Sequence, residues 1–310
     1  MNALPHELNA VIESQVPLTI DAHRARLHLW NHRGHRLYYV DEGPRDGKVI
    51  VLLHGMPTSS WLYRAIIPRL AAEGLRVIAP DMLGFGASDK PADVNVYAFA
   101  QQADRLHALM ASLGIAHWAQ AVHDLGGPWT WELVDRHPKS LNGLVVMNTT
   151  AYRQGFAPPA IMRLARSPMG PFMAFMMRNR VTGPSQVKGL LRQFTAYPDN
   201  ITDAVVHGYW LSMQEGGGHA FLAFAKAFPW WFAQFDRYAE ALRQLRIPAA
   251  TLWGRHDKVL DVNQLPRQFA QDLRIDASQQ HSLDAGHFLQ EDQPAEVARR
   301  LALFMQEVRP

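Results

Sequence analysis

The sequence contains no cysteine. Disulfide bonds, thiolate catalysis and cysteine-based metal sites are therefore excluded. It also has no apolar run of about 20 residues, so no membrane-spanning helix is expected. The net charge is only +3 and the charges are mixed along the chain, which argues against a nucleic-acid surface. The first fifteen residues have no basic region followed by an apolar run, so we expect no signal peptide and a cytoplasmic location.

Short apolar runs alternate with amphipathic stretches of helical length along much of the 310-residue chain. Strands are predicted at 36–40, 48–55, 76–82, 118–124, 141–148, 248–257 and 279–287. Helices are predicted at 60–74, 96–114, 127–137 and 294–308. This rhythm predicts an α/β fold with a mostly parallel, doubly wound sheet. Because the strand segments are continuously apolar, we expect them to be buried on both faces.

The strand–helix rhythm stops between residues 152 and 245, where the pattern is helical and no clear strand occurs. We therefore expect a core formed by residues 1–151 and 246–310, with residues 152–245 inserted as a helical cap. An insertion at the carboxyl ends of parallel strands would cover the crevice in which such sheets bind ligands.

The stretch AVHDLGGPW places one carboxylate, Asp124, between a predicted buried strand and a predicted helix. Gly126 and Gly127 allow a sharp turn, and Pro128 suits the first turn of the helix. This is the arrangement of a nucleophile elbow, with Asp in the position that Ser occupies in serine hydrolases. A simple helix-capping role for Asp124 is the alternative when this segment is considered alone.

Two further residues favour a catalytic role for Asp124. Asp257 and His287 each follow a predicted strand, in the chain order nucleophile, acid, histidine that elbow hydrolases use. The other position where an acid could stand, after the strand at 141–148, holds Asn148 and no carboxylate. Asp257 is therefore the expected partner of His287.

The turn HGMPTSS, which begins at His54, follows another predicted strand. It would direct the backbone N–H of Met56 toward the elbow. Together with the N–H of Leu125, it would form an oxyanion hole. A plain strand-to-helix turn is the alternative reading.

Five stretches together resemble the α/β-hydrolase superfamily, in the branch of haloalkane dehalogenases and epoxide hydrolases: HGMPTSSWLYR, VIAPDMLGFGASDKP, VHDLGG, WGRHDKV and DAGHFLQED. The resemblance covers residues 36–151 and 247–309. It implies Asp124 as nucleophile, His287 as base and Asp257 as the acid that orients it. It also implies that no metal or organic cofactor is needed. The expected partners are a small apolar organic substrate and water, and the oligomeric state is left open.

The chain departs from the dehalogenase pattern at both halide-binding positions. Members of that family usually carry Trp after the nucleophile and Asn or Glu after the His-Gly pair, where this chain has Leu125 and Met56. Neither side chain can donate a hydrogen bond to a departing halide. We therefore place epoxide hydrolysis ahead of haloalkane dehalogenation. Hydrolysis of a lactone or ester, or binding without turnover, are further alternatives.

Epoxide hydrolases of this branch open the ring with help from cap tyrosines. The cap contains Tyr152, Tyr197, Tyr209 and Tyr238. The expected substrate pocket combines residues from the turn and the cap, namely His54, Tyr152, Tyr209 and Trp210. The alternative for Tyr209 and Trp210 is packing of the cap on the core.

The cap also contains a methionine-rich stretch, MGPFMAFMMRNR, at residues 169–180. Methionine adapts to irregular surfaces, so we expect this stretch to line an apolar pocket and to pack the cap. A contact with a membrane surface beside Arg178 and Arg180 is the alternative.

Overall fold

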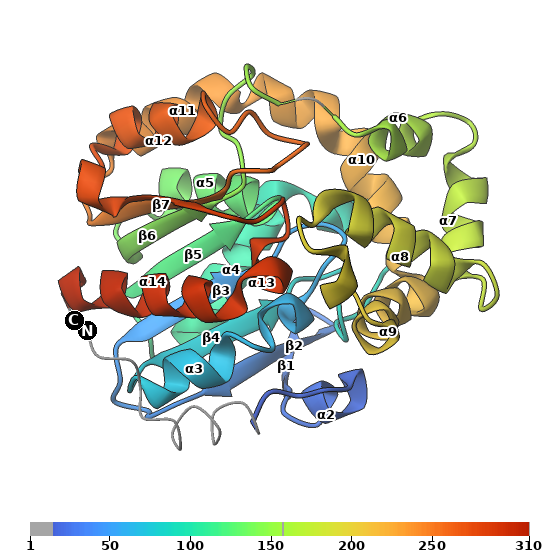
Figure 1. Ribbon diagram of the computed structural model, residues 1–310, viewed down its shortest axis with the longest axis horizontal. Helices are drawn as coiled ribbons and strands as arrows, with labels where there is room; N and C mark the ends of the chain where they lie inside the picture. Colours follow the sequence, from blue (N-terminus) through green and yellow to red (C-terminus); the bar gives the residue numbers. More distant parts are fainter. Residues whose placement is uncertain (1–14, 157, 310) are drawn as a thin grey trace.

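A computed structural model describes residues 15–156 and 158–309 (Figure 1). Residues 1–14, to which most of the expectation about a signal peptide applies, lie outside this part. Within the described residues, no helix is both long enough and apolar enough to cross a membrane.

One eight-stranded sheet runs through the centre of the described chain, in the order β1-β2-β4-β3-β5-β6-β7-β8. The pairs β1–β2 and β2–β4 are antiparallel and the remaining pairs are parallel. The predicted mostly parallel α/β sheet is therefore confirmed. The strands are β1 (His28–His32), β2 (His35–Glu42), β3 (Val49–Leu53), β4 (Arg76–Asp81), β5 (Trp118–His123), β6 (Leu141–Met147), β7 (Ala249–Gly254) and β8 (Gln280–Leu283).

Helices cover both faces of this sheet (Figure 1). The helices α3 and α14 pack together on the near face, and α4 packs on α5 behind the sheet. Every residue of β4 and β5 is buried as a result, which explains why most residues of both strands are apolar. The helices outside the cap are α2 (Ile20–Arg24), α3 (Ile67–Ala72), α4 (Phe99–Ser112), α5 (Gly126–Arg136), α12 (Leu265–Leu273), α13 (Leu289–Asp292) and α14 (Pro294–Glu307).

The segment between β6 and β7 forms helices, which Figure 1 shows along the top and right of the sheet. They are α6 (Ala160–Arg166), α7 (Gly170–Arg178), α8 (Gly183–Phe194), α9 (Asp203–Ser212), α10 (Gly218–Ala233) and α11 (Phe235–Gln244). Aromatic side chains join this segment to the core. Phe224 of α10 stacks on Phe85 with ring centroids 5.3 Å apart, and Trp61 donates a hydrogen bond to the Val205 carbonyl of α9.

Two of the local differences from the sequence prediction have a clear physical reason. Strand β1 was not predicted, because it is largely exposed and carries little hydrophobic pattern. It pairs with β2 through a tight turn in which Arg33 and Gly34 both have positive φ. The predicted helix at 60–74 is divided into a 3₁₀ turn, Ser60–Tyr63, and α3. Pro68 is the cause, because proline is suited to the first turn of a helix and not to its interior.

Candidate active site

Asp124 follows β5 directly and has φ of 49°, a left-handed conformation that is uncommon for a residue other than glycine. Helix α5 begins two residues later, so the backbone turns sharply at this point. The turn leaves no room for neighbouring side chains, since a Cβ on Gly55 would lie 2.4 Å from the Cβ of Asp124. A strained backbone conformation persists only where the surrounding structure enforces it, and such conformations are often found at active sites.

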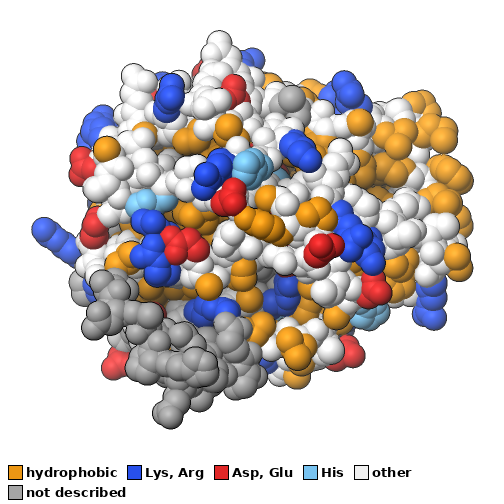
Figure 2. All heavy atoms as spheres, viewed as in Figure 1, with side chains coloured by type: hydrophobic (Ala, Val, Ile, Leu, Met, Phe, Trp, Pro, Cys, Tyr) orange, Lys and Arg blue, Asp and Glu red, His pale blue; other side chains and the backbone are white. Residues whose placement is uncertain are grey.

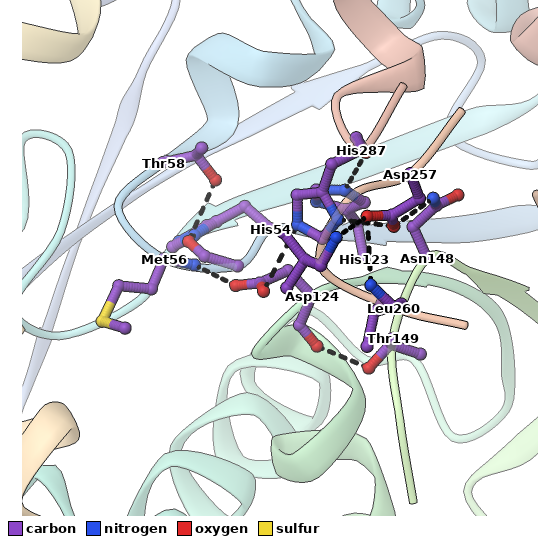
Figure 3. A network of polar contacts seen from close by, with 12 residues as sticks. His54, Met56, Thr58, His123, Asp124, Asn148, Thr149, Asp257, Leu260 and His287 are labelled. Carbon is purple, nitrogen blue, oxygen red and sulfur yellow. Dashed lines mark hydrogen bonds and ion pairs between the residues drawn. The ribbon is translucent and has the colours of Figure 1, made fainter. Parts of the chain in front are cut away.

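The carboxylate of Asp124 lies next to two backbone segments. The N–H of Met56, in the turn after β3, donates to Oδ1 of Asp124 at 2.7 Å (Figure 3). Leu125 caps the amino end of α5, where backbone N–H groups have no partner within the helix. Both N–H groups expected to form an oxyanion hole therefore belong to segments that adjoin the Asp124 carboxylate.

His287 lies between two carboxylates (Figure 3). Its Nδ1 is 2.8 Å from Oδ2 of Asp257, and its Nε2 is 3.5 Å from Oδ2 of Asp124. The Asp257 side chain is fully buried, whereas the Asp124 side chain is 27% exposed. The structure thus brings together the three residues that the sequence predicts as a triad.

Asn148 also belongs to this cluster. Its Nδ2 donates to Oδ2 of Asp257 at 2.6 Å, and its Oδ1 accepts from the Gly254 N–H at 2.9 Å. The backbone N–H of Val259 donates to the other Asp257 oxygen at 2.7 Å. Asn148 therefore fixes the orientation of the Asp257 carboxylate. In the sequence it was noted only as a position without a carboxylate.

These contacts determine the charges in the cluster. Burial alone would lower the pKa of His287, but the carboxylates of Asp257 and Asp124 raise it to about 10. Burial alone would raise the pKa of Asp124, but the hydrogen bond and charge of His287 keep it below its usual range. The pKa of Asp257 is lowered against burial in the same way, mainly by His287. At neutral pH the imidazole is therefore protonated and both carboxylates are ionised.

His123 lies beneath the triad and keeps its ring in a neutral form. Its ring centroid is 4.9 Å from that of His287, and its Nε2 donates to the His287 carbonyl at 2.8 Å. Burial, followed by the charge of His287, lowers the pKa of His123 to about 4. This hydrogen bond holds the backbone of His287 in place.

Two adjoining apolar cavities border Asp124. The side chains common to both come from the core and the helical segment: Met56, Asp124, Phe156 and Met162. Leu125, Thr149, Thr150, Phe224, Phe228, Trp231 and Leu260 complete the first cavity. The second cavity is lined also by His287, Phe221, Leu190 and Phe194. A carboxylate in such surroundings is placed to meet an apolar molecule.

None of the four residues expected in the pocket lines either cavity in the described part of the chain, and their polar groups are engaged elsewhere. His54 is buried beneath the turn and accepts the Met82 N–H. The hydroxyls of Tyr152 and Tyr209 donate to Asp272 and Glu291, and the Trp210 indole donates to the Met177 carbonyl. The expectation for these four residues is corrected accordingly.

The stretch at 169–180 does not line these cavities either. Met173 and Met177 pack inside the helical segment, as expected for cap packing, whereas Phe172 and Phe175 are exposed.

Trp231 of α10 is a cavity residue that the sequence analysis did not single out. Its side chain lines the first cavity, and its indole nitrogen is buried with no hydrogen-bond partner among the described residues. The hydroxyls of Thr149 and Thr150, by contrast, donate to the carbonyls of Asp124 and Tyr152. Among residues 15–156 and 158–309 there is no group of three or more His, Asp or Glu residues that could hold a metal ion.

Comparison with known proteins agrees with this architecture. A family model described as alpha/beta hydrolase fold matches residues 48–294. A haloalkane dehalogenase of Mycobacterium marinum is 32% identical over 278 residues, covering 86% of this chain and 87% of that protein. The crystal structure of Cfl2 from Burkholderia cenocepacia has a TM-score of 0.74 at 27% identity, covering 90% of this chain and 95% of that one.

A fold likeness extends to the epoxide hydrolase CorEH, with a TM-score of 0.68 at 22% identity, covering 91% of this chain and 99% of that one. The chain therefore belongs to the α/β-hydrolase fold family, in the branch of haloalkane dehalogenases and epoxide hydrolases, and it is a hydrolase.

Proposed function

We propose that this hydrolase cleaves an apolar alkyl electrophile through a covalent ester on Asp124. The observation that carries the proposal is a single ionised carboxylate, partly exposed in an apolar cavity and 3.5 Å from the Nε2 of His287. An ionised carboxylate is a competent nucleophile toward an electrophilic carbon, and desolvation in an apolar site increases its reactivity.

In the first step, one Asp124 oxygen forms a bond to the substrate carbon, and the leaving group departs with the bonding electron pair. The hydrogen bond from Met56 to Oδ1 orients the carboxylate for this attack. Ester formation removes the negative charge of Asp124, so the protonated His287 releases its proton to solvent. In the second step, the neutral His287 takes a proton from water, and the resulting hydroxide adds to the Asp124 carbonyl carbon. The N–H groups of Met56 and Leu125 stabilise the oxyanion. The ester then collapses, the alcohol leaves with the proton from His287, and Asp124 is restored.

The available donors indicate the class of leaving group. Trp231 lines the first cavity and its indole N–H has no acceptor among the described residues, whereas no tyrosine lines either cavity. An indole can donate a hydrogen bond to a departing halide, but it cannot supply the proton that an opened epoxide must gain. We therefore propose a haloalkane as the first candidate substrate. With Leu125 and Met56 at the usual halide-binding positions, bromide and iodide should be released far better than chloride.

Epoxide hydrolysis is the second candidate, because Leu125 and Met56 offer no side-chain donor to a halide. The sequence alone places epoxide hydrolysis first, and the unpartnered Trp231 N–H in the structure reverses this order. In that case the opened oxygen would have to take its proton from water or from the protonated His287, because no tyrosine lines either cavity.

A substrate panel tests the proposal. Bromo-, iodo- and chloroalkanes, aryl and alkyl epoxides and p-nitrophenyl esters are incubated with the wild-type protein and with Asp124→Gly. Glycine suits a residue with φ of 49°, so this variant removes the carboxylate without adding backbone strain. We expect bromide release by the wild type and none by Asp124→Gly. Turnover of the best substrate by Asp124→Gly at more than a few per cent of the wild-type rate would overturn Asp124 as nucleophile.

A further inference from the structure

One face of the molecule is both basic and apolar. From Arg136 to Pro198 the sequence contains no Asp or Glu, while it contains several Lys and Arg residues. Four of the arginines, all exposed, lie on or next to α6 and α7: Arg163, Arg166, Arg178 and Arg180. In the described part of the chain, none of these four guanidinium groups forms an ion pair or a side-chain hydrogen bond. Lys188 on α8, by contrast, is paired with Asp203 at 2.7 Å.

Large apolar side chains are exposed on the same segment as these arginines. They are Leu164, Met169, Phe172, Phe175 and Val181, with exposed fractions of 43%, 52%, 56%, 62% and 85%. Figure 2 shows hydrophobic side chains gathered at the right-hand edge, where α7 lies in Figure 1. We call these five residues and the four arginines the α6–α7 face. Contiguous exposed apolar surface of this kind usually marks a contact site.

The inner side of α7 packs against the rest of the helical segment. Met173, Ala174 and Met177 bury the inner side of α7. Phe172 and Phe175 are three residues apart, so their side chains lie along the same outer side of the helix. The two aromatic rings are thus presented outward by packed backbone and are not part of the internal core.

We propose that the α6–α7 face docks on an anionic lipid surface. Aromatic and aliphatic side chains enter the boundary between headgroups and acyl chains, and arginines on the same face pair with lipid phosphates. The charges disfavour a second copy of this chain as the occupant. In a two-fold dimer through this face, the four arginines of one copy would meet those of the other, with no acidic residue of 136–198 to compensate them.

This position has a consequence for the substrate, which rests on the proposed function. Helix α6 exposes Arg163 and Leu164, while its Ile161 and Met162 line the cavities at Asp124. Docking would therefore bring the helix that borders the cavity to the lipid surface, where apolar alkyl compounds accumulate. Lipid binding itself needs no catalysis, so it can be tested whether or not the proposed reaction is correct.

Vesicle flotation with the full chain tests the docking. The protein is mixed with vesicles of phosphatidylcholine alone, or of phosphatidylcholine with phosphatidylglycerol, at low and at high salt. Two variants alter the face separately, Phe172→Ser with Phe175→Ser, and Arg178→Glu with Arg180→Glu. The control combines Val94→Ser with Arg267→Glu, which alters one exposed apolar residue and one exposed arginine outside the face. Circular dichroism and thermal unfolding check that every variant is folded.

We expect the wild type and the control to float with the anionic vesicles, more at low salt than at high salt. Each face variant should bind at least about tenfold more weakly, since a charge near the membrane surface and a buried aromatic ring both contribute strongly. Absence of wild-type binding to anionic vesicles would overturn the proposal, as would equal binding by the face variants and the control. A wild-type dimer that the face variants dissociate, without lipid binding, would assign the face to a second copy instead.

Discussion

The Nε2 atom of His287 lies 3.5 Å from Oδ2 of Asp124, so the imidazolium and the carboxylate stabilise each other's charged form. This relationship links the two proposed steps. In the free protein the pKa of His287 is about 10, and the ring is protonated when Asp124 attacks. Conversion of Asp124 to a neutral ester removes one of the two carboxylates that hold the proton. The pKa of His287 then falls, which favours the neutral ring that the second step requires as a base.

Replacement of Asp124 by Asn imitates this loss of charge. We expect the pKa of His287 to be clearly lower in Asp124→Asn than in the wild type, where it is about 10. Asparagine also tolerates a positive φ, so the turn should be kept. Titration of the His287 ring by NMR in both proteins measures the difference. An unchanged pKa would mean that Asp257 alone sets the charge of His287, and that ester formation does not prepare the base.

Trp231 provides a second prediction, for the leaving group. Trp231→Phe keeps an aromatic ring in the cavity and removes the unpartnered N–H. Loss of one preorganised donor to a developing anion lowers kcat by about a hundredfold, and we expect a reduction of this order in bromide release. Trp129→Phe is the matched control, because the Trp129 indole nitrogen is also buried without a partner but Trp129 lines neither cavity. Equal losses in both variants would indicate a packing effect and not a role in the reaction.

The sequence predicts that Asp124, Asp257 and His287 lie close together, because each comes after a strand and the three occur in the chain order nucleophile, acid, histidine. The loops after parallel strands meet at one edge of the sheet, so the neighbours of these residues follow from topology. Asn148 follows such a strand too, but an amide carries no signal of its own until its distance to Asp257 is known.

The cavity wall was predicted less well. Trp231 and Phe156 come from distant parts of the chain, and they meet because of how the helical segment packs. Tyr209 was expected at the substrate, but a buried tyrosine hydroxyl needs a partner and finds one in Glu291, which is itself paired with Arg64. A local sequence pattern does not show which hydrogen-bond partner a buried hydroxyl will find elsewhere in the chain.

The buried neutral histidines lead to a prediction about stability. Burial is the main cause that lowers the pKa of both His23 and His123 to about 4 in the folded protein, from 6.5. Between pH 6.5 and 4 the unfolded chain therefore binds protons that the folded protein does not, and stability falls as the pH falls. His287 adds no slope in this window, because its raised pKa keeps it protonated in the folded state as well, and its contribution is lost only as the pH rises from 6.5 through about 10. The lowered pKa values of Asp124 and Asp257 matter mainly below about pH 3.8.

Urea unfolding at several pH values measures this effect. We expect the midpoint to fall steadily from pH 6.5 to 4.5, each pKa unit of difference being worth about 1.4 kcal/mol per histidine. His23→Gln keeps a polar contact to Ser60 and should reduce the slope, whereas the exposed His207→Gln should leave it unchanged. A midpoint independent of pH over this range would show that His23 and His123 are not the titrating groups.

The covalent ester on Asp124 should be trapped when the base of the second step is removed. His287 acts on water in the second step only, so its removal should spare the attack by Asp124 and block hydrolysis of the ester. We expect His287→Gln to accumulate an adduct when it is mixed with a substrate that the wild type consumes. Intact-mass spectrometry detects the adduct, and peptide mapping should place it in the segment AVHDLGGPW, at Asp124. Asp257→Asn is a useful companion, because it leaves the imidazole in place without its orienting carboxylate and should slow the same step less completely.

The mass of the adduct also identifies the substrate class. An opened epoxide stays on Asp124 with its oxygen, so the mass increases by that of the whole epoxide. An alkyl halide loses its halogen as a free halide ion, and only the alkyl group stays on Asp124. The mass therefore increases by that of the alkyl group less one proton. Two results would contradict the two-step mechanism. One is full turnover by His287→Gln, which would mean that His287 is not the base. The other is the absence of any adduct on Asp124 with every substrate that the wild type hydrolyses, which would mean that the reaction does not pass through an ester at the end of β5.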